Sequence, residues 1–169
     1  MEFELRNTYL MLEDKELLAQ CDETRYRGSG PGGQKRNKTE NAVLLTHRKT
    51  GIAAKTSESR SLLANRKGAL RLLRFRLSTE IRLPPGPLSE ELSTVIQNRP
   101  TKAQRAQPWH FVALSELLDA FVQYDLSIAE TASQLQTKTS TISRILNDNP
   151  LIQKRVNEWR QQKGLSTLR

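Results

Sequence analysis

The chain has 169 residues, of which 36% are hydrophobic, so it can form one ordinary domain or two small ones with modest cores. Its 27 lysines and arginines outnumber its 18 aspartates and glutamates, and the net charge of +9 makes a polyanion the expected partner. The single cysteine, Cys21, excludes an internal disulfide and any site built from several cysteines.

Nothing in the sequence predicts export or membrane insertion. No apolar run approaches the roughly 20 residues that span a bilayer, and the chain does not start with the basic and apolar stretches of a signal peptide. Acidic side chains at Glu2, Glu4 and Glu13 also argue against an organellar transit peptide. We therefore expect a cytoplasmic protein without a membrane partner, in which Cys21 is a small packed side chain.

The first part of the chain predicts short elements around a glycine-rich loop. Residues 12–19 predict a helix, because acidic residues lie in its first turn and Leu17 and Leu18 can share a buried side. A strand is expected over residues 22–27. Residues 28–33 then hold four glycines and a proline, which the interior of a helix or strand does not tolerate. They predict a loop with a special backbone shape.

Residues 42–47 and 52–56 predict the two strands of a β-hairpin, because both runs are strand-like and the loop between them ends in Gly51. Residues 59–83 predict a long helix whose apolar side chains recur at spacings of 7, 3, 4 and 4. Basic residues occupy much of the remaining surface, either as a solvated face or as a contact for a polyanion. The predicted apolar stripe consists of Leu63, Leu70, Leu73, Leu77 and Ile81.

Three prolines within residues 84–87 must end this helix, because proline lacks a backbone donor and restricts the residue before it. We predict an α+β fold: a small domain at 1–83 with a short sheet and a long packed helix, followed by an all-α module at 109–169. Between them, residues 84–108 form a Pro-rich and basic linker. Helices are expected near residues 89–97, 109–124, 128–135, 140–147 and 151–163.

The residues after the glycines distinguish between kinds of glycine-rich loop. A P-loop requires a lysine and then serine or threonine after its last glycine, and a dinucleotide site requires a further glycine that opens a helix. Here Gln34 follows the glycines, and Lys35, Arg36 and Lys38 come next. The loop thus presents an amide and three cations, a combination that favours salt-dependent binding to nucleic-acid phosphates or, without catalysis, a plain basic loop.

The run from Arg27 to Thr39, with Gly-Pro-Gly-Gly-Gln at residues 30–34, resembles the catalytic loop of the class I peptide chain release factors. The resemblance continues through the predicted hairpin at residues 42–52 and through residues 59–70 of the long helix. It covers about half of the chain, roughly residues 10–83. A lone Gly-Gly-Gln would be a weak signal, because three residues recur by chance, whereas this extended run is specific.

The resemblance implies that the chain hydrolyses the ester bond of peptidyl-tRNA on the ribosome, with Gly32, Gly33 and Gln34 as the catalytic residues. The backbone N–H of Gln34 would stabilise charge that develops in the transition state, and its side-chain amide would shape the water pocket. The two glycines would let the main chain approach RNA closely. The expected contacts to RNA phosphates are Arg25, Arg27, Lys35, Arg36 and Lys38.

The resemblance also implies the partners, which are peptidyl-tRNA and the large-subunit RNA of the peptidyl transferase centre. We expect a monomer with no cofactor. We also expect no metal, because His47 and His110 are more typical of packing or surface residues than of a metal or catalytic pair. Full release factors carry domains that read the stop codon, for which 169 residues leave no room. The expected function is therefore codon-independent peptide release, of the kind that rescues stalled ribosomes.

Residues 127–135 and 140–146 resemble a helix-turn-helix, although Gln136 and Thr137 replace the usual glycine and apolar residue of the turn. Residues 109–169 carry seven basic and six acidic side chains, so a structural or ribosome-docking role competes with nucleic-acid reading. The alternative function for the whole chain is a non-catalytic nucleic-acid-binding protein. The interior of this pair is expected to contain Ile128, Ala132, Leu135, Ile142 and Ile145, and the candidate nucleic-acid contacts are Ser140, Thr141 and Arg144.

Overall fold

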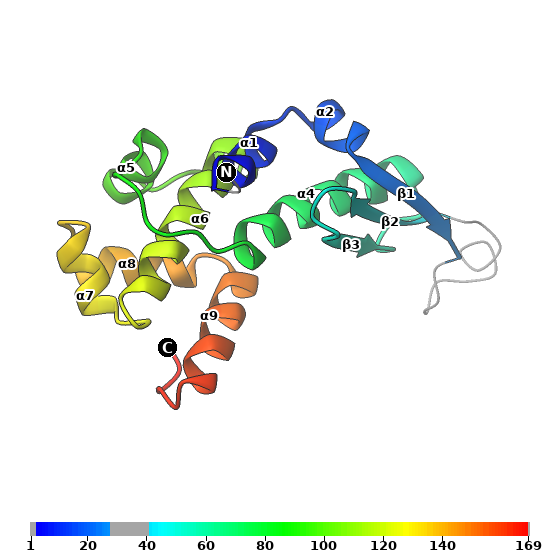
Figure 1. Ribbon diagram of the computed structural model, residues 1–169. Coiled ribbons are helices and arrows are strands. Elements are labelled where there is room, and N and C mark those ends of the chain that lie inside the picture. The colour runs from blue at the N-terminus through cyan, green and yellow to red at the C-terminus, as the bar shows by residue number, and fades with distance from the viewer. Residues whose placement is uncertain (1–2, 28–40, 169) are drawn as a thin grey trace. The chain divides into compact units, whose positions relative to one another are not determined.

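The computed structural model, which describes residues 3–27 and 41–168, divides the chain into two units, Met1–Glu80 and Ile81–Arg169 (Figure 1). The first unit combines helices with a sheet, whereas the described residues of the second unit form helices only. The predicted α+β fold with a helical module is therefore confirmed.

The first unit contains, in its described part, an antiparallel sheet with the strand order β1-β2-β3. Its elements are α1 (Phe3–Met11), α2 (Asp14–Ala19), β1 (Cys21–Tyr26), β2 (Ala42–His47), β3 (Ala53–Thr56) and α4 (Leu62–Glu80). The predicted hairpin is confirmed, since β2 pairs with β3. Gly51 lies in the hairpin loop with a φ of 69°, a left-handed conformation that glycine adopts without a Cβ clash.

Helix α4 packs against β2 and β3, and the core of the first unit lies between them. Alternate side chains of β2, namely Val43, Leu45 and His47, are buried, as the two-residue period of a strand requires. The prediction that Leu63 belongs to the apolar stripe of α4 is wrong, because this side chain is 60% exposed. It lies in the first turn of the helix, before the part that packs on the sheet. The buried apolar residues of α4 are Ala69, Leu70, Leu73 and Leu77.

A buried arginine joins the N-terminal helices to α4. Arg74 donates from Nη1 to the carbonyl oxygen of Leu10 at 2.7 Å, and from Nη2 to that of Leu12 at 2.6 Å. Its Nη2 also lies 2.8 Å from Asp14 Oδ1. These carbonyls lie at and just after the end of α1, where backbone acceptors have no helical partner. A buried guanidinium is tolerated here because acceptors surround it.

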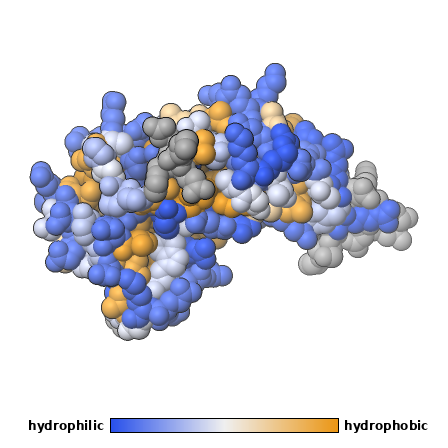
Figure 2. Space-filling view, in the orientation of Figure 1, coloured by the Kyte–Doolittle hydropathy of each residue, from blue (hydrophilic) through white to orange (hydrophobic). Residues whose placement is uncertain are grey.

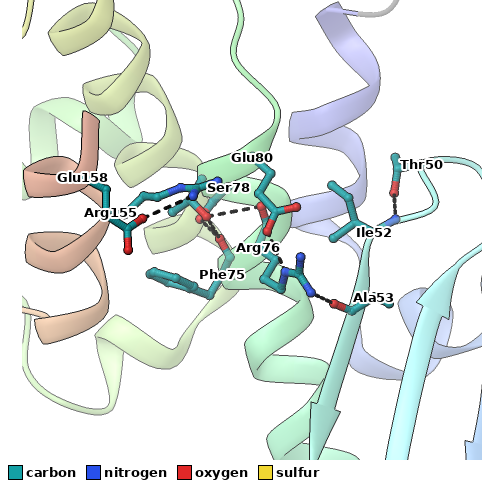
Figure 3. A network of polar contacts seen from close by, with 10 residues as sticks. Thr50, Ile52, Ala53, Phe75, Arg76, Ser78, Glu80, Arg155 and Glu158 are labelled. Atoms are coloured by element: carbon teal, nitrogen blue, oxygen red, sulfur yellow. Dashed lines mark hydrogen bonds and ion pairs between the residues drawn. The ribbon is translucent and has the colours of Figure 1, made fainter. Parts of the chain in front are cut away.

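A second arginine of α4 binds the sheet, as Figure 3 shows. Arg76 donates from Nε to Glu80 Oε1 at 2.6 Å and from Nη1 to the carbonyl oxygen of Ala53 at the start of β3. In the neighbouring hairpin loop, Thr50 Oγ1 accepts the backbone N–H of Ile52 at 3.3 Å. Part of the basic surface predicted for α4 therefore serves the fold.

The second unit is built around α6, whose side chains are buried on nearly all sides. Helix α6 packs against α5 and α7, and α8 packs against α5, α7 and α9. The helices predicted beyond residue 87 are all confirmed, within two residues at their ends. The elements of this unit are α5 (Glu90–Gln97), η1 (Gln104–Ala106), α6 (Pro108–Gln123), α7 (Ile128–Gln134), α8 (Thr139–Asn147) and α9 (Pro150–Gln162).

The long helix ends at Glu80, three residues earlier than predicted. The backbone N–H of Leu83 donates to Asp119 Oδ1 on α6 at 3.0 Å, and Arg82 Nη1 lies 3.0 Å from the same oxygen. Since Leu83 precedes a proline, helical backbone is disfavoured there, and the segment binds α6 instead. The predicted linker at 84–108 holds helix α5, which is capped by Ser89 Oγ accepting from Leu92 N at 3.1 Å.

The turn between α7 and α8 has the backbone shape of a glycine turn without a glycine. Gln136 has a φ of 49°. Its N–H donates to Ser133 O at 3.1 Å, and Thr137 N–H donates to Ala132 O at 2.9 Å. This pair of hydrogen bonds is typical of a helix that ends at a residue with left-handed backbone conformation, and that residue is usually glycine. Helix α9 ends in the same way at Gly164, with a φ of 72°.

We predict that Gln136→Gly raises the free energy of unfolding by about 0.5–1 kcal/mol, because glycine adopts a positive φ without the Cβ penalty. Gly164→Ala is the matched control: it adds a Cβ at the equivalent position of α9, where no described atom lies within 4 Å, and should cost about 1 kcal/mol. Urea denaturation followed by circular dichroism measures both changes. A destabilised Gln136→Gly would show that the glutamine side chain holds the turn.

Candidate functional site

The glycine-rich loop connects β1 to β2, and both of its attachments are described. Tyr26, the last residue of β1, is the register partner of Ala42, the first residue of β2. The loop segment therefore leaves and re-enters the sheet at adjacent positions of two antiparallel strands. The predicted catalytic residues and three predicted RNA contacts lie outside the described residues; they are Gly32, Gly33, Gln34, Lys35, Arg36 and Lys38.

A buried asparagine of α4 binds the point where the loop returns. Asn65 is 2% exposed and donates from Nδ2 to Asn41 O at 2.6 Å and to Ser59 O at 2.7 Å. Its Oδ1 accepts Ser59 N–H at 2.8 Å, and Asn41 donates from its own Nδ2 to Arg60 O at 2.8 Å. An alanine here would leave these partly buried backbone groups without the partners that Asn65 provides. The sequence signal for Asn65, which we missed, is a polar residue four positions before Ala69 on the apolar face of the helix.

Glu23 links the strand that leads into the loop to α4. Arg66 donates to it from Nε at 2.7 Å and from Nη2 at 2.9 Å, and Arg25 Nε donates to Oε1 at 3.0 Å. The hydrogen bonds from Arg66 lower the pKa of the Glu23 carboxyl, burial opposes them, and Arg25 adds to the lowering. The carboxylate therefore stays ionised and joins β1 to the helix.

The two described RNA-contact candidates, Arg25 and Arg27, lie at the base of the loop. Arg25 is half exposed and shares the carboxylate of Glu23, whereas Arg27 is exposed and directly follows β1. Lys55 of β3 joins this group, since its Nζ lies 4.1 Å from the ring centroid of Tyr26. Hydrophilic residues, in blue, dominate the right-hand part of the face in Figure 2, where the strands lie.

The basic residues of α4 separate into two groups. One group is bound to carbonyl or carboxylate oxygens of the first unit and consists of Arg66, Arg74 and Arg76. In the other, Lys67 and Arg71 are exposed one turn apart, and Arg60 is exposed just before the helix. Within the described residues, the side chains of Arg60, Lys67 and Arg71 make no hydrogen bond or ion pair. We call these three residues the exposed α4 cations; they suit a polyanion.

The candidate contacts of the helical unit have different surroundings. Ser140 is exposed and Thr141 is partly exposed at the start of α8. Arg144 is engaged within the unit, because Nη1 lies 3.6 Å from Asp148 Oδ2 and Nη2 donates to Val95 O at 3.4 Å. Of the residues predicted to lie inside the helix pair, Ala132, Ile142 and Ile145 are buried, and Ile128 and Leu135 are partly exposed.

The two histidines lie in different units and are packed. His47 is buried, with Nδ1 2.9 Å from Thr50 Oγ1 and Nε2 3.2 Å from Gln20 Oε1, and burial lowers its pKa. Burial also lowers the pKa of His110, to about 4. Among the described residues, no group of three His, Cys, Asp or Glu side chains is placed to hold a metal ion. None of the described helices combines the length and apolar character of a membrane span.

Comparison with known proteins gives one family. The model of the RF-1 domain matches residues 15–113, which is more than half of the chain. The matched range includes the three strands, the glycine-rich loop, α4 and α5. No solved structure matches this chain.

The similar curated proteins are release factors. Peptide chain release factor 1 of Thermobifida fusca is 51% identical over 55 residues, which are 32% of this chain and 16% of that protein. Peptide chain release factor 1 of Streptomyces griseus is 50% identical over 52 residues, 31% of this chain and 14% of that protein. Mitochondrial translation release factor in rescue of Danio rerio is 50% identical over 58 residues, 34% of this chain and 37% of that protein. The chain thus matches well under half the length of each.

We predict that Asn65→Ala lowers the free energy of unfolding by about 1–3 kcal/mol, because it removes three hydrogen bonds to the partly buried backbone of Asn41 and Ser59. Leu63→Ala on the same helix should change it by less than about 0.5 kcal/mol, since Leu63 is exposed. Urea denaturation compares the two variants. An Asn65→Ala loss no larger than that of Leu63→Ala would contradict the anchoring role.

We predict that Glu23→Gln lowers stability by about 1 kcal/mol at neutral pH. The folded pKa of Glu23 lies below its usual value of 4.5, so the ion pair contributes stability above about pH 4.5 and loses it as pH falls through the lowered folded pKa. Glu23→Gln should therefore lose less stability than the native chain between neutral pH and about pH 3. Asp22→Asn, on a 69% exposed side chain, is the control. Identical pH profiles for the native chain and Glu23→Gln would refute this assignment.

Proposed function

The chain belongs to the RF-1 domain family, and we therefore propose that it hydrolyses the ester bond of peptidyl-tRNA on the ribosome. The match to residues 15–113 carries this proposal, because it includes the glycine-rich loop and the elements that bind both ends of it. Relatives named peptide chain release factor 1 and translation release factor in rescue support the same reaction class. We propose the chain as a cytoplasmic monomer that acts with ribosomal RNA and peptidyl-tRNA.

In this proposal, the catalytic residues are Gly32, Gly33 and Gln34 of the loop, which enters the peptidyl transferase centre. The backbone N–H of Gln34 stabilises negative charge as water attacks the ester, and its side-chain amide orients that water. Glycine at positions 32 and 33 permits a close approach of the main chain to RNA. The protein then needs no general base of its own, since positioning and electrostatic stabilisation supply the rate.

The basic residues around the loop supply binding energy in this scheme. Arg25 and Arg27 stand where β1 leads into the loop, and Lys35, Arg36 and Lys38 follow the catalytic residues in sequence. The exposed α4 cations add three charges on the same unit. Contacts of this kind orient a protein on RNA without reading its sequence, and they weaken as salt concentration rises.

We further propose that release is independent of a codon and serves stalled ribosomes. This finer proposal is supported by the Danio rerio relative, which is named as a release factor in rescue and shares 50% identity over 58 residues. Residues 1–83 would then form the catalytic domain. The helical module at 109–169 would dock on the ribosome, joined through residues 84–108, where α5 supports α6.

We predict that Gln34→Ala and Gly33→Ala each lower the rate of peptide release by about 100-fold. The assay uses purified stalled ribosomes that carry labelled peptidyl-tRNA, together with the full chain. Gln161→Ala, an exposed residue of α9, is the control and should release peptide at the native rate. Equal release by Gln34→Ala and native protein would refute the catalytic role and favour the alternative, a non-catalytic nucleic-acid-binding protein.

A further inference from the structure

Three arginines of the second unit converge on one carboxylate. Arg99 Nη2 lies 3.4 Å from Asp148 Oδ1, while Arg105 Nη1 and Arg144 Nη1 lie 3.7 Å and 3.6 Å from Asp148 Oδ2. The arginines come from three segments: Arg99 follows α5, Arg105 lies in η1, and Arg144 lies in α8. Asp148 lies between α8 and α9. Folding therefore gathers them at one place.

This cluster has excess positive charge. Three guanidinium groups face a single carboxylate, and within the described residues none of them has a second carboxylate within 4.0 Å. Two positive charges are thus left over. The Asp148 side chain is only 17% exposed, whereas that of Arg99 is 68% exposed, so the acid lies at the base of the cluster and a cation lies at its surface.

Asp148 also leaves some N–H donors of the three arginines without a close acceptor. Charge-assisted contacts between a guanidinium and a carboxylate are usually about 2.7–2.9 Å, shorter than all three contacts here. Arg105 directs Nε to Pro100 O at 3.0 Å, and Arg144 Nη1 is buried but makes no hydrogen bond to any described atom. An arginine has five N–H donors, so the cluster can accept a further multivalent oxygen ligand.

The amino end of a neighbouring helix increases the positive potential. Helix α9, 13 residues long, begins at Pro150 directly after the cluster, and the amino end of a helix carries a partial positive charge. Burial is the main cause of the lowered pKa of His110; the charge of Arg105 adds to the lowering, and that of Asp148 opposes it. The surroundings therefore suit an anion.

We propose that Arg99, Arg105 and Arg144 form a binding site for phosphodiester groups of an RNA backbone. The choice of RNA, and not another phosphate compound, rests on the proposed function of the chain on the ribosome. Guanidinium groups bind phosphate oxygens through paired N–H donors, which a cluster of three can provide for neighbouring phosphates. Asp148 holds the arginines together in the absence of RNA and reduces the affinity by its own charge.

The test measures binding of the full chain to a fluorescent single-stranded RNA at several salt concentrations. Arg99→Gln should weaken binding about 3- to 10-fold at low salt and reduce the slope of log Kd against log salt by about 0.7–1. Asp148→Asn should act in the opposite direction, with binding about 3- to 10-fold tighter and a steeper slope. Lys154→Gln, an exposed residue of α9 that loses the same charge, should stay within about twofold of the native affinity.

A purely structural ion cluster gives a different result. Unchanged RNA binding by Arg99→Gln and Asp148→Asn, with both variants folded by circular dichroism, would overturn the proposal. Weaker RNA binding by folded Asp148→Asn would also overturn it. The same holds if Arg99→Gln weakens binding to a DNA oligonucleotide or to inorganic phosphate but leaves RNA binding unchanged. Gln34→Ala separates this site from the proposed catalysis. In a chain that carries Gln34→Ala, adding Arg99→Gln should weaken RNA binding by the same factor as in the native chain. This result is expected whether or not the native chain releases peptide.

Discussion

One buried amide holds the backbone that directly follows the glycine-rich segment. Asn65 binds the backbone of Asn41 and Ser59 from within α4, so the returning end of the loop is joined to the helix. The pairing of Tyr26 with Ala42 joins the two ends of the loop to each other. Backbone groups that lose water on folding must find such partners, and the amide provides both a donor and an acceptor in the correct places.

The arginines of α4 show that one residue type serves several purposes in the same helix. Arg74 is buried and satisfies carbonyls at the end of α1, and Arg66 pairs with Glu23 on the strand that leads to the loop. Lys67 and Arg71 remain exposed. The net charge of a basic helix therefore overstates the charge that is available to a polyanion, because each inward arginine is already neutralised or hydrogen-bonded within the fold.

In the helical unit, too, the tertiary contacts of a residue decide its role. The turn at Gln136 reproduces a glycine conformation, so the α7–α8 pair keeps its shape although the expected glycine is absent. Arg144, expected to be available on α8, instead faces Asp148 together with Arg99 and Arg105. An ion cluster with excess positive charge is thus a better candidate for contact with a polyanion than Ser140 and Thr141 at the start of α8, which carry no charge.

The sequence by itself determined the α+β class, the hairpin, the boundaries of the α-helices from α2 onward to within a few residues, and the resemblance of the loop, because glycine, proline and apolar spacing act locally. It did not predict α1. It did not identify Asn65, and it misplaced Leu63, since one apolar period cannot show where a helix meets its sheet. Only the tertiary structure decided which cations are used internally. Arg99 and Arg144 find Asp148 from distant segments, and such partners leave no signature in the neighbouring sequence.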